Sequence, residues 1–174
     1  MKKRFLKTVI GVVFVCILFV GFLCANNNIG MTSTDLEADI RSSQKIKDDW
    51  TLDGSVSNTM AAYISYPQDM NDHIFSVYVN RPGLSFGYFF RGGGSLSGVQ
   101  RGIAEFTVEG YNERAFISMN QQQVQQLEID DGNTIQVVDI DRNKPFAIVL
   151  PINAGNITFY DVNRNTVEYW NNPL

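Results

Sequence analysis

Short runs of β-branched and aromatic residues recur along the chain from Met60 onward, and they constrain the fold more than any other feature. Each run is about five to eight residues long and is separated from the next by clusters of Gly, Pro, Asn and Asp. Such spacing is typical of antiparallel strands joined by hairpins. Besides the segment from Ile74 to Arg91, the runs predict strands at residues 60–66, 103–109, 114–119, 134–140, 146–152, 157–162 and 166–170. The sequence therefore predicts a mainly β protein, formed as one antiparallel β-sandwich of about eight or nine strands between Trp50 and Leu174.

The segment from Ile74 to Arg91 is predicted to form the central hairpin of this sandwich. Pro82 and Gly83 occupy the two central positions of a turn that Arg81 and Leu84 flank. Counting outward from this turn gives a strand register and places six large apolar side chains on one face that must be buried. We expect three cross-strand pairs: Val79 with Phe86, Val77 with Tyr88 and Phe75 with Phe90.

One short helix is predicted before the strands, between Thr34 and Lys47. Thr34 followed by Glu37 fits a capping box, in which each side chain bonds a backbone N–H at the start of the helix. Leu36 and Ile40 share one face at helical spacing. We expect this helix to pack on the sandwich or against a membrane.

The N-terminus carries a basic cluster followed by an apolar run from Val9 to Ala25. A short positive region ahead of an uncharged apolar stretch is typical of a segment that enters the membrane and leaves its basic end in the cytoplasm. As a helix the apolar run would measure about 25 Å, slightly less than a hydrocarbon core of about 30 Å. A cleaved signal peptide and an uncleaved signal anchor therefore both remain open.

The residues near the end of this run do not decide between the two. Cleavage after Ala25 would place Leu23 where a signal peptidase prefers a small residue. Leu23 also disfavours a third alternative, lipid modification of Cys24. We expect a signal peptide or anchor over residues 1–25, a flexible spacer over 26–34 and a single extracytoplasmic β domain over 35–174.

Both cysteines, Cys16 and Cys24, lie inside the leader, so residues 26–174 can form neither a disulfide nor a cysteine metal site. A chain of this length buries enough surface to fold without disulfides, which favours a bacterial exported protein. Ten of the fourteen Lys and Arg and all eighteen Asp and Glu follow residue 25, giving this part a net charge of −8. Nucleic acid is therefore not an expected partner.

Residues that can act as acids or bases are scattered along the sequence. His73 is the only histidine and lies beside Asp69 and Asp72, so a general-base role is an alternative to a purely structural one. Glu105, Glu109, Glu113 and Glu128 are possible carboxylates for glycoside hydrolysis. Alternation with Phe106 and Val108 places Glu105 and Glu109 on a solvated face. No cofactor is expected.

Asp139, Asp141 and Asn143 follow the alternating oxygen ligands at the start of a calcium loop. Lys144 stands where such a loop needs glycine, and Leu150 stands where it needs a bidentate glutamate. The segment from Asp161 to Asn165 has the same incomplete pattern. Hairpin turns capped by Asp and Asn side chains are the favoured interpretation of both.

The segment from Asn120 to Gln126 is unusually rich in side-chain amides. Amides pair with sugar hydroxyls and peptide backbones, and exposed aromatic rings stack on sugars. Six residues are therefore candidates for ligand binding: Gln121, Gln123, Gln125, Tyr111, Tyr169 and Trp170. A polar edge strand or short helix without a ligand is the favoured interpretation of the amide-rich segment, and ligand binding is the alternative.

These observations favour a non-catalytic binding or interaction module of the bacterial cell envelope, secreted or anchored to the cytoplasmic membrane by its N-terminal segment. A glycan, a wall polymer or an envelope protein is the expected partner. An extracellular hydrolase that uses carboxylates or His73 is one alternative. An envelope structural or assembly protein with exposed strand edges is the other.

Overall fold

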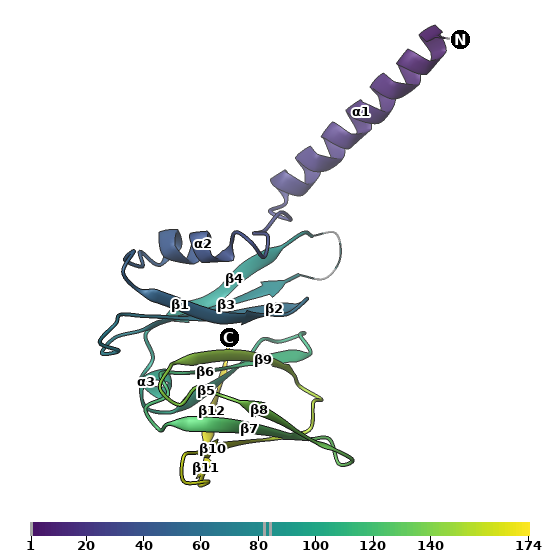
Figure 1. Ribbon diagram of the computed structural model, residues 1–174. Coiled ribbons are helices and arrows are strands. Elements are labelled where there is room, and N and C mark those ends of the chain that lie inside the picture. The colour runs from purple at the N-terminus through teal and green to yellow at the C-terminus, as the bar shows by residue number, and fades with distance from the viewer. Residues whose placement is uncertain (1, 82, 84) are drawn as a thin grey trace.

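Three four-stranded sheets lie one above another in the computed structural model, which describes residues 2–81, 83 and 85–174, with side chains from residue 9 (Figure 1). We name them as Figure 1 shows them: the upper sheet (β1-β2-β3-β4), the middle sheet (β12-β5-β6-β9) and the lower sheet (β11-β10-β7-β8). The pairing is antiparallel except between β12 and β5, which are parallel.

The helices are α1 (Lys2–Ala25), α2 (Leu36–Ser43) and α3 (Ser97–Arg101). The strands of the upper sheet are β1 (Thr51–Val56), β2 (Met60–Tyr66), β3 (Ile74–Asn80) and β4 (Tyr88–Gly94). Those of the middle sheet are β5 (Ile103–Thr107), β6 (Glu113–Ser118), β9 (Phe146–Pro151) and β12 (Tyr169–Pro173). Those of the lower sheet are β7 (Val124–Asp130), β8 (Ile135–Asp139), β10 (Asn156–Asp161) and β11 (Thr166–Val167).

The prediction of a mainly β protein is confirmed, but a single sandwich of eight or nine strands is wrong, since the described residues form twelve strands in three sheets. The middle sheet is apolar on both faces, and this produces the extra layer. Along β6, Ala115 and Ile117 pack against the upper sheet, whereas Phe116 between them packs against the lower sheet. Two apolar cores therefore lie above and below one shared sheet.

Glu105 illustrates the consequence of this third layer. The sequence places it on a solvated face, but its side chain is buried because the lower sheet covers that face. It lies on β5 directly opposite Phe116 on β6. The guanidinium of Arg114 donates a 3.0 Å hydrogen bond to the Glu105 carboxylate and also lies over the Phe116 ring. An ion pair is thus enclosed between the middle and lower sheets.

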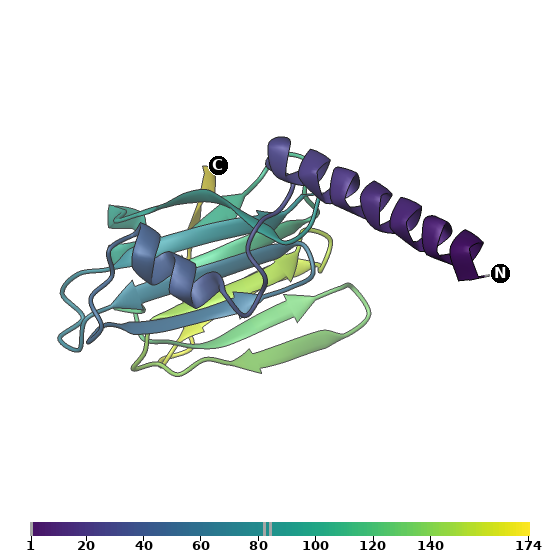
Figure 2. The ribbon, with the colours of Figure 1, turned by 90° about the horizontal axis from the view of Figure 1, so that it is seen from above.

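Helix α2 covers the outer face of the upper sheet (Figure 2). Leu36 and Ile40 on one face of the helix are fully buried against Tyr78 and other upper-sheet residues, as the helical spacing predicts. The helix is shorter than the predicted span of 34–47. Asp35 is its N-cap, and the hydroxyl of Thr32 donates a hydrogen bond to the Asp35 carboxylate, so the predicted capping box does not form.

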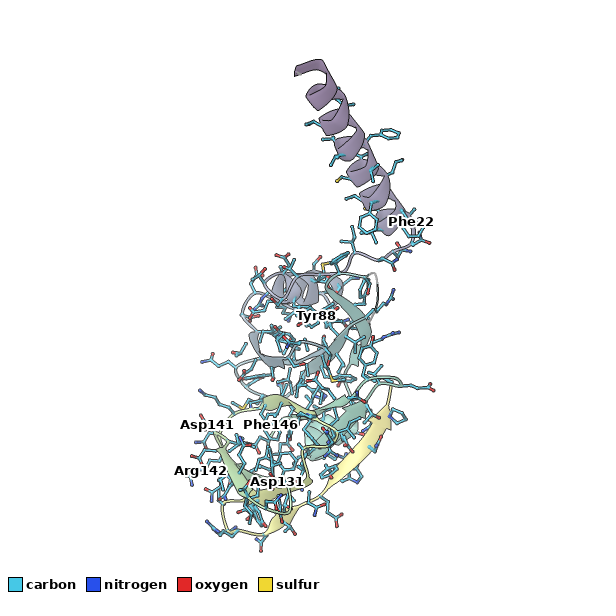
Figure 3. The ribbon with its side chains drawn as sticks, turned by 90° about the vertical axis from the view of Figure 1, so that its right-hand side faces the viewer. Phe22, Tyr88, Asp131, Asp141, Arg142 and Phe146 are labelled. Atoms are coloured by element: carbon cyan, nitrogen blue, oxygen red, sulfur yellow. The ribbon has the colours of Figure 1, made fainter. Side chains whose placement is uncertain are left out.

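Strands β3 and β4 form the predicted hairpin with a different register. Tyr78 pairs with Phe90 and Val79 with Phe89, and a bulge shifts the register between Val77 and Tyr78. Tyr88 therefore packs beneath α2 instead of in the core that contains Val77 and Val79 (Figure 3). The connection runs from 81 to 87, a longer loop than the predicted turn, and two residues of that turn, Pro82 and Leu84, lie outside the described residues.

Helix α1 projects away from the three sheets (Figures 1 and 2). Among the residues whose side chains are described, no helix has both the length and the apolar character needed to cross a membrane. The segment 26–34, predicted to be a flexible spacer, is hydrogen-bonded to β4: the N–H of Met31 donates to the carbonyl of Tyr88 and the N–H of Tyr88 donates back.

Buried tyrosines in and around the upper sheet make the fold sensitive to alkaline pH. Burial raises the pKa of Tyr78, whose hydroxyl also donates a 2.7 Å hydrogen bond to Asp39. Burial likewise raises the pKa of Tyr63, Tyr66 and Tyr88. Because folding favours the neutral phenol, these groups contribute stability that is complete below about pH 10 and is lost as the pH rises toward their folded values.

Spectrophotometric titration of the seven tyrosines should therefore show a class that ionises late, together with unfolding at alkaline pH. The Tyr78→Phe variant should have one late-ionising group fewer. Ionisation of all seven tyrosines as one group near pH 10, with the fold intact, would contradict the described burial.

Candidate binding site

Strand β12 is an edge strand of the middle sheet and presents two neighbouring aromatic residues to opposite faces. Tyr169 points into the core between the middle and lower sheets, where its ring centroid lies 5.1 Å from that of Phe116 and 6.1 Å from that of Phe159. Trp170 is 49 % exposed. Of the two predicted aromatic candidates on this strand, Trp170 is therefore available to a ligand and Tyr169 supports the core.

The Trp170 ring rests against the backbone of Gly102, which immediately precedes β5. A Cβ atom built on Gly102 would lie 2.2 Å from the nearest ring atom, so a larger residue at this position would displace the indole. The parallel pairing of β12 with β5 brings these two distant parts of the chain together. The sequence contains no signal that links residue 102 with residue 170, and Gly102 was not among the predicted site residues.

Shallow grooves flank Trp170 on two sides. One has a volume of about 480 Å³ and is polar; the other has a volume of about 350 Å³ and lies beside α3. The first is lined by Gln122, Asp161, Thr166, Val167, Glu168 and Trp170. The second is lined by Leu96, Ser97, Gly98, Arg101, Trp170 and Asn172. We refer to the two grooves and the indole between them as the Trp170 surface.

The amide-rich turn between β6 and β7 contributes to the first groove. Asn120 fixes this turn: its side-chain amide donates to the carbonyls of Val124 and Asp141, and its side-chain carbonyl accepts from the N–H of Val124. With Asn120 buried, the side chains of Gln121, Gln122 and Gln123 are left exposed, and we call residues 120–123 the glutamine turn. Among them, Gln122 lines the groove beside Trp170.

Asp161 gives the first groove a negative charge. Its carboxylate accepts hydrogen bonds from the side-chain amide of Asn165 and from the backbone N–H groups of Asn163 and Asn165. These bonds, that from the Asn165 side chain foremost, hold the pKa of Asp161 below its usual value. Their contribution to stability is present above the ordinary carboxyl pKa and is lost as the pH falls through the lowered one.

Gln125, Asp139, Asp141 and Asn143 line a different hollow of about 440 Å³ around the β8–β9 turn. Asp141 lies on the outer side of the lower half of the structure (Figure 3). Its carboxylate accepts the N–H of Asn143 and forms an ion pair with Lys144 at 3.5 Å. This is the geometry of a capped turn, and the part of the chain with described side chains holds no group of three or more acidic, His or Cys residues placed to bind a metal.

Tyr111 lies far from the Trp170 surface along β6, because it precedes this strand whereas the glutamine turn follows it. It lines a pocket of about 310 Å³ together with Arg81 and several polar residues. The remaining lining residues are Asn58, Thr59, Asn80, Gly110 and Asn112. The predicted binding residues thus fall into separate places: Trp170 and the glutamine turn, the hollow at Gln125, the core at Tyr169 and the pocket at Tyr111.

His73 is buried, with 2 % of its surface exposed. Its Nε2 accepts the backbone N–H of Leu96 at 3.1 Å, so its Nδ1 carries the proton and donates to the side-chain carbonyl of Gln100 at 2.8 Å. The neighbouring Asp72 carboxylate accepts the backbone N–H of His73 instead of contacting the ring. These bonds join the start of β3 to the segment around α3, which is a structural role.

The candidate carboxylates are dispersed as well. Glu105 pairs with Arg114 between two sheets, and Glu113 accepts the hydroxyls of Ser57 and Thr59 beside the Tyr111 pocket. The side-chain amide of Gln126 donates to Glu128 on the lower sheet.

Comparison of the chain with protein-family models, with curated proteins and with solved structures finds no match.

Proposed function

We propose that this protein is a non-catalytic binding module of a bacterial cell envelope, exported or held at the cytoplasmic membrane with residues 35–174 outside. Its proposed ligand is a glycan or a wall polymer. The observation that carries the proposal is the exposed Trp170 ring between two open grooves. The N-terminal basic cluster and apolar run support the extracytoplasmic location.

The chemistry of the Trp170 surface suits a sugar polymer. The apolar face of a sugar ring can stack on the flat, apolar face of the Trp170 indole. The amide of Gln122 can both donate to and accept from hydroxyls, and the carboxylates of Asp161 and Glu168 can accept from them. Because grooves lie on two sides of the ring, an extended chain can continue past the stacked residue in either direction.

Retention of the protein by a bacterial wall fraction tests this proposal. The Trp170→Ala variant should bind about 30-fold more weakly, which corresponds to about 2 kcal/mol, because a central aromatic contact is removed. Tyr111→Ala is the matched control, since it removes an aromatic residue from the separate pocket. Equal retention of wild type and Trp170→Ala, or loss only with Tyr111→Ala, would contradict the assignment to the Trp170 surface.

Assembly through β8 is a second candidate function, favoured by the exposure of this strand. β8 is an edge of the lower sheet, and its Ile135 and Val137 side chains lie exposed on its outer face. An unpaired edge with apolar side chains can add a strand from another chain. Sizing chromatography should then show a defined oligomer that Val137→Lys converts to monomer; a wild-type monomer at all concentrations would contradict this function.

A further inference from the structure

The junction between α1 and the sheets is fixed by hydrogen bonds. The N–H groups of Asn26, Asn27 and Asn28 donate to carbonyls in the last turn of α1, at 3.1, 3.1 and 2.9 Å. Leu23, in the same turn, is buried, whereas Phe22 beside it is exposed (Figure 3). The chain therefore leaves the helix along one defined path.

The next residues bind the edge of β4 and the loop before it. The N–H of Phe86 donates to the carbonyl of Asn28 at 2.8 Å, and the N–H of Gly30 donates to the carbonyl of Phe86 at 2.7 Å. Gly30 is needed here, because a Cβ atom at this position would lie 2.4 Å from the carbonyl oxygen of Tyr88. With Met31 also bonded to Tyr88, the direction in which α1 projects is coupled to the upper sheet.

Exposed apolar side chains gather at this junction. Phe86 and Phe90 are 56 % and 46 % exposed, and Ile29 and Met31 on the bonded segment are 49 % and 40 % exposed. We call these four residues the β4 patch. Large apolar side chains along α1, from Val9 to Phe22, are also exposed, so uncovered apolar surface continues from the helix onto the domain.

Charged side chains of both signs lie beside the β4 patch: Asp39 lines one hollow with Ile29, Met31 and Phe90, and two arginines lie near the same residues. Arg81 holds its guanidinium 4.0 Å from the centroid of the Phe89 ring, and Arg91 directly follows Phe90 on β4. These are two of only ten basic residues in a part of the chain with net charge −8. Apolar side chains such as Phe accompanied by arginine suit the boundary of a bilayer, where the apolar groups enter the region between headgroups and acyl chains and guanidinium groups bind phosphate.

We infer that the β4 patch lies against the lipid surface that receives α1, so that the membrane orients the domain as well as holding it. This inference rests on the membrane attachment in the proposed function. Because α1 is coupled to β4, insertion of α1 brings Phe86 and Phe90 to the headgroup region. The lower sheet, on the far side of the stack, then faces away from the membrane (Figure 1).

Tryptophan reporters in the full chain, reconstituted in phosphatidylcholine vesicles with brominated acyl chains, test this inference. Trp50 and Trp170 are first replaced by Phe to remove the native fluorescence. Separate variants then carry Phe86→Trp in the β4 patch, Phe14→Trp in α1 and Ile135→Trp on the lower sheet. Far-UV circular dichroism checks that each folds, and Ile29→Trp serves as a second patch reporter.

We expect bromine to quench the reporters at positions 14 and 86, and contact with the membrane to blue-shift the emission at position 86, with neither effect at position 135. Quenching at 14 without quenching at 86 or 29 would overturn the patch inference while leaving membrane attachment in place. Absence of quenching at all of these positions would overturn both.

Discussion

Replacing Glu105 with alanine is expected to lower the free energy of unfolding by about 3–5 kcal/mol, because Arg114 would remain buried without its partner. The two side chains are 8 % and 14 % exposed. The Nε of Arg114 already has no hydrogen-bond partner among the described residues. Removing the carboxylate therefore leaves the guanidinium without the 3.0 Å bond that now compensates its burial.

Chemical denaturation of matched variants checks this result. Glu109→Ala removes a carboxylate from an exposed position two residues beyond β5 and should change stability by no more than about 0.5 kcal/mol. The double variant Glu105→Met, Arg114→Met should recover most of the loss, since buried ion pairs are often replaceable by apolar residues. Equal, small effects of Glu105→Ala and Glu109→Ala would mean that the lower sheet does not cover β5.

Replacing Phe116 with alanine should cost about 3–5 kcal/mol of stability, because it leaves a cavity between the middle and lower sheets. The Phe116 ring is fully buried, and its centroid lies 5.3 Å from that of Phe159 on β10 and 5.1 Å from that of Tyr169. Since these rings fill one space, the effects of Phe116→Ala and Phe159→Ala should not be additive.

Thermal or urea unfolding measures both variants against Val137→Ala, which shortens an exposed apolar side chain on β8. That control should change stability by less than about 0.5 kcal/mol. Additive effects of the two phenylalanine substitutions would contradict their contact across the two sheets.

The extents of most strands could be predicted from the sequence because each is a compact apolar run between turn residues. Met60 to Tyr66 was predicted as a strand and is β2, and predicted strands coincide closely with β5, β6 and β9. β1 and β7 were missed because their apolar residues are interrupted by Asp53 and Gly54 in one and by amides in the other. The last predicted strand, from Thr166 to Trp170, divides between β11 and β12 in different sheets.

The number of layers could not be predicted by assuming strict alternation. The runs in β2 and β9 are almost continuously apolar, which is typical of strands buried on both faces. β5 is also buried on both faces, but Glu105 in its sequence suggests the opposite, because a carboxylate normally lies on a solvent-exposed face. Here the ion pair with Arg114 compensates the burial of Glu105. The pairing of Glu105 with a residue nine positions later depends on the β5–β6 hairpin register.

The candidate site could be predicted only in part. The exposure of Trp170 and of the glutamine turn agrees with the proposed use of an aromatic ring and amides. The separation of Tyr111 from these residues depends on which end of β6 each occupies. The inward orientation of the half-buried Tyr169 depends on the alternation of side chains along β12. Gly102 lies next to Trp170 only because β5 and β12 pair in parallel, and these strands are more than sixty residues apart in the sequence.

Titration of the isotope-labelled protein with soluble glycan fragments of a bacterial wall tests the central claim most directly. The chain has two tryptophans, so two indole N–H signals report on Trp170 and on half-buried Trp50 next to the α2 core. We predict that the Trp170 signal shifts in a saturable way while the Trp50 signal stays in place. An unmoved Trp170 signal in the presence of excess glycan would contradict binding at the Trp170 surface.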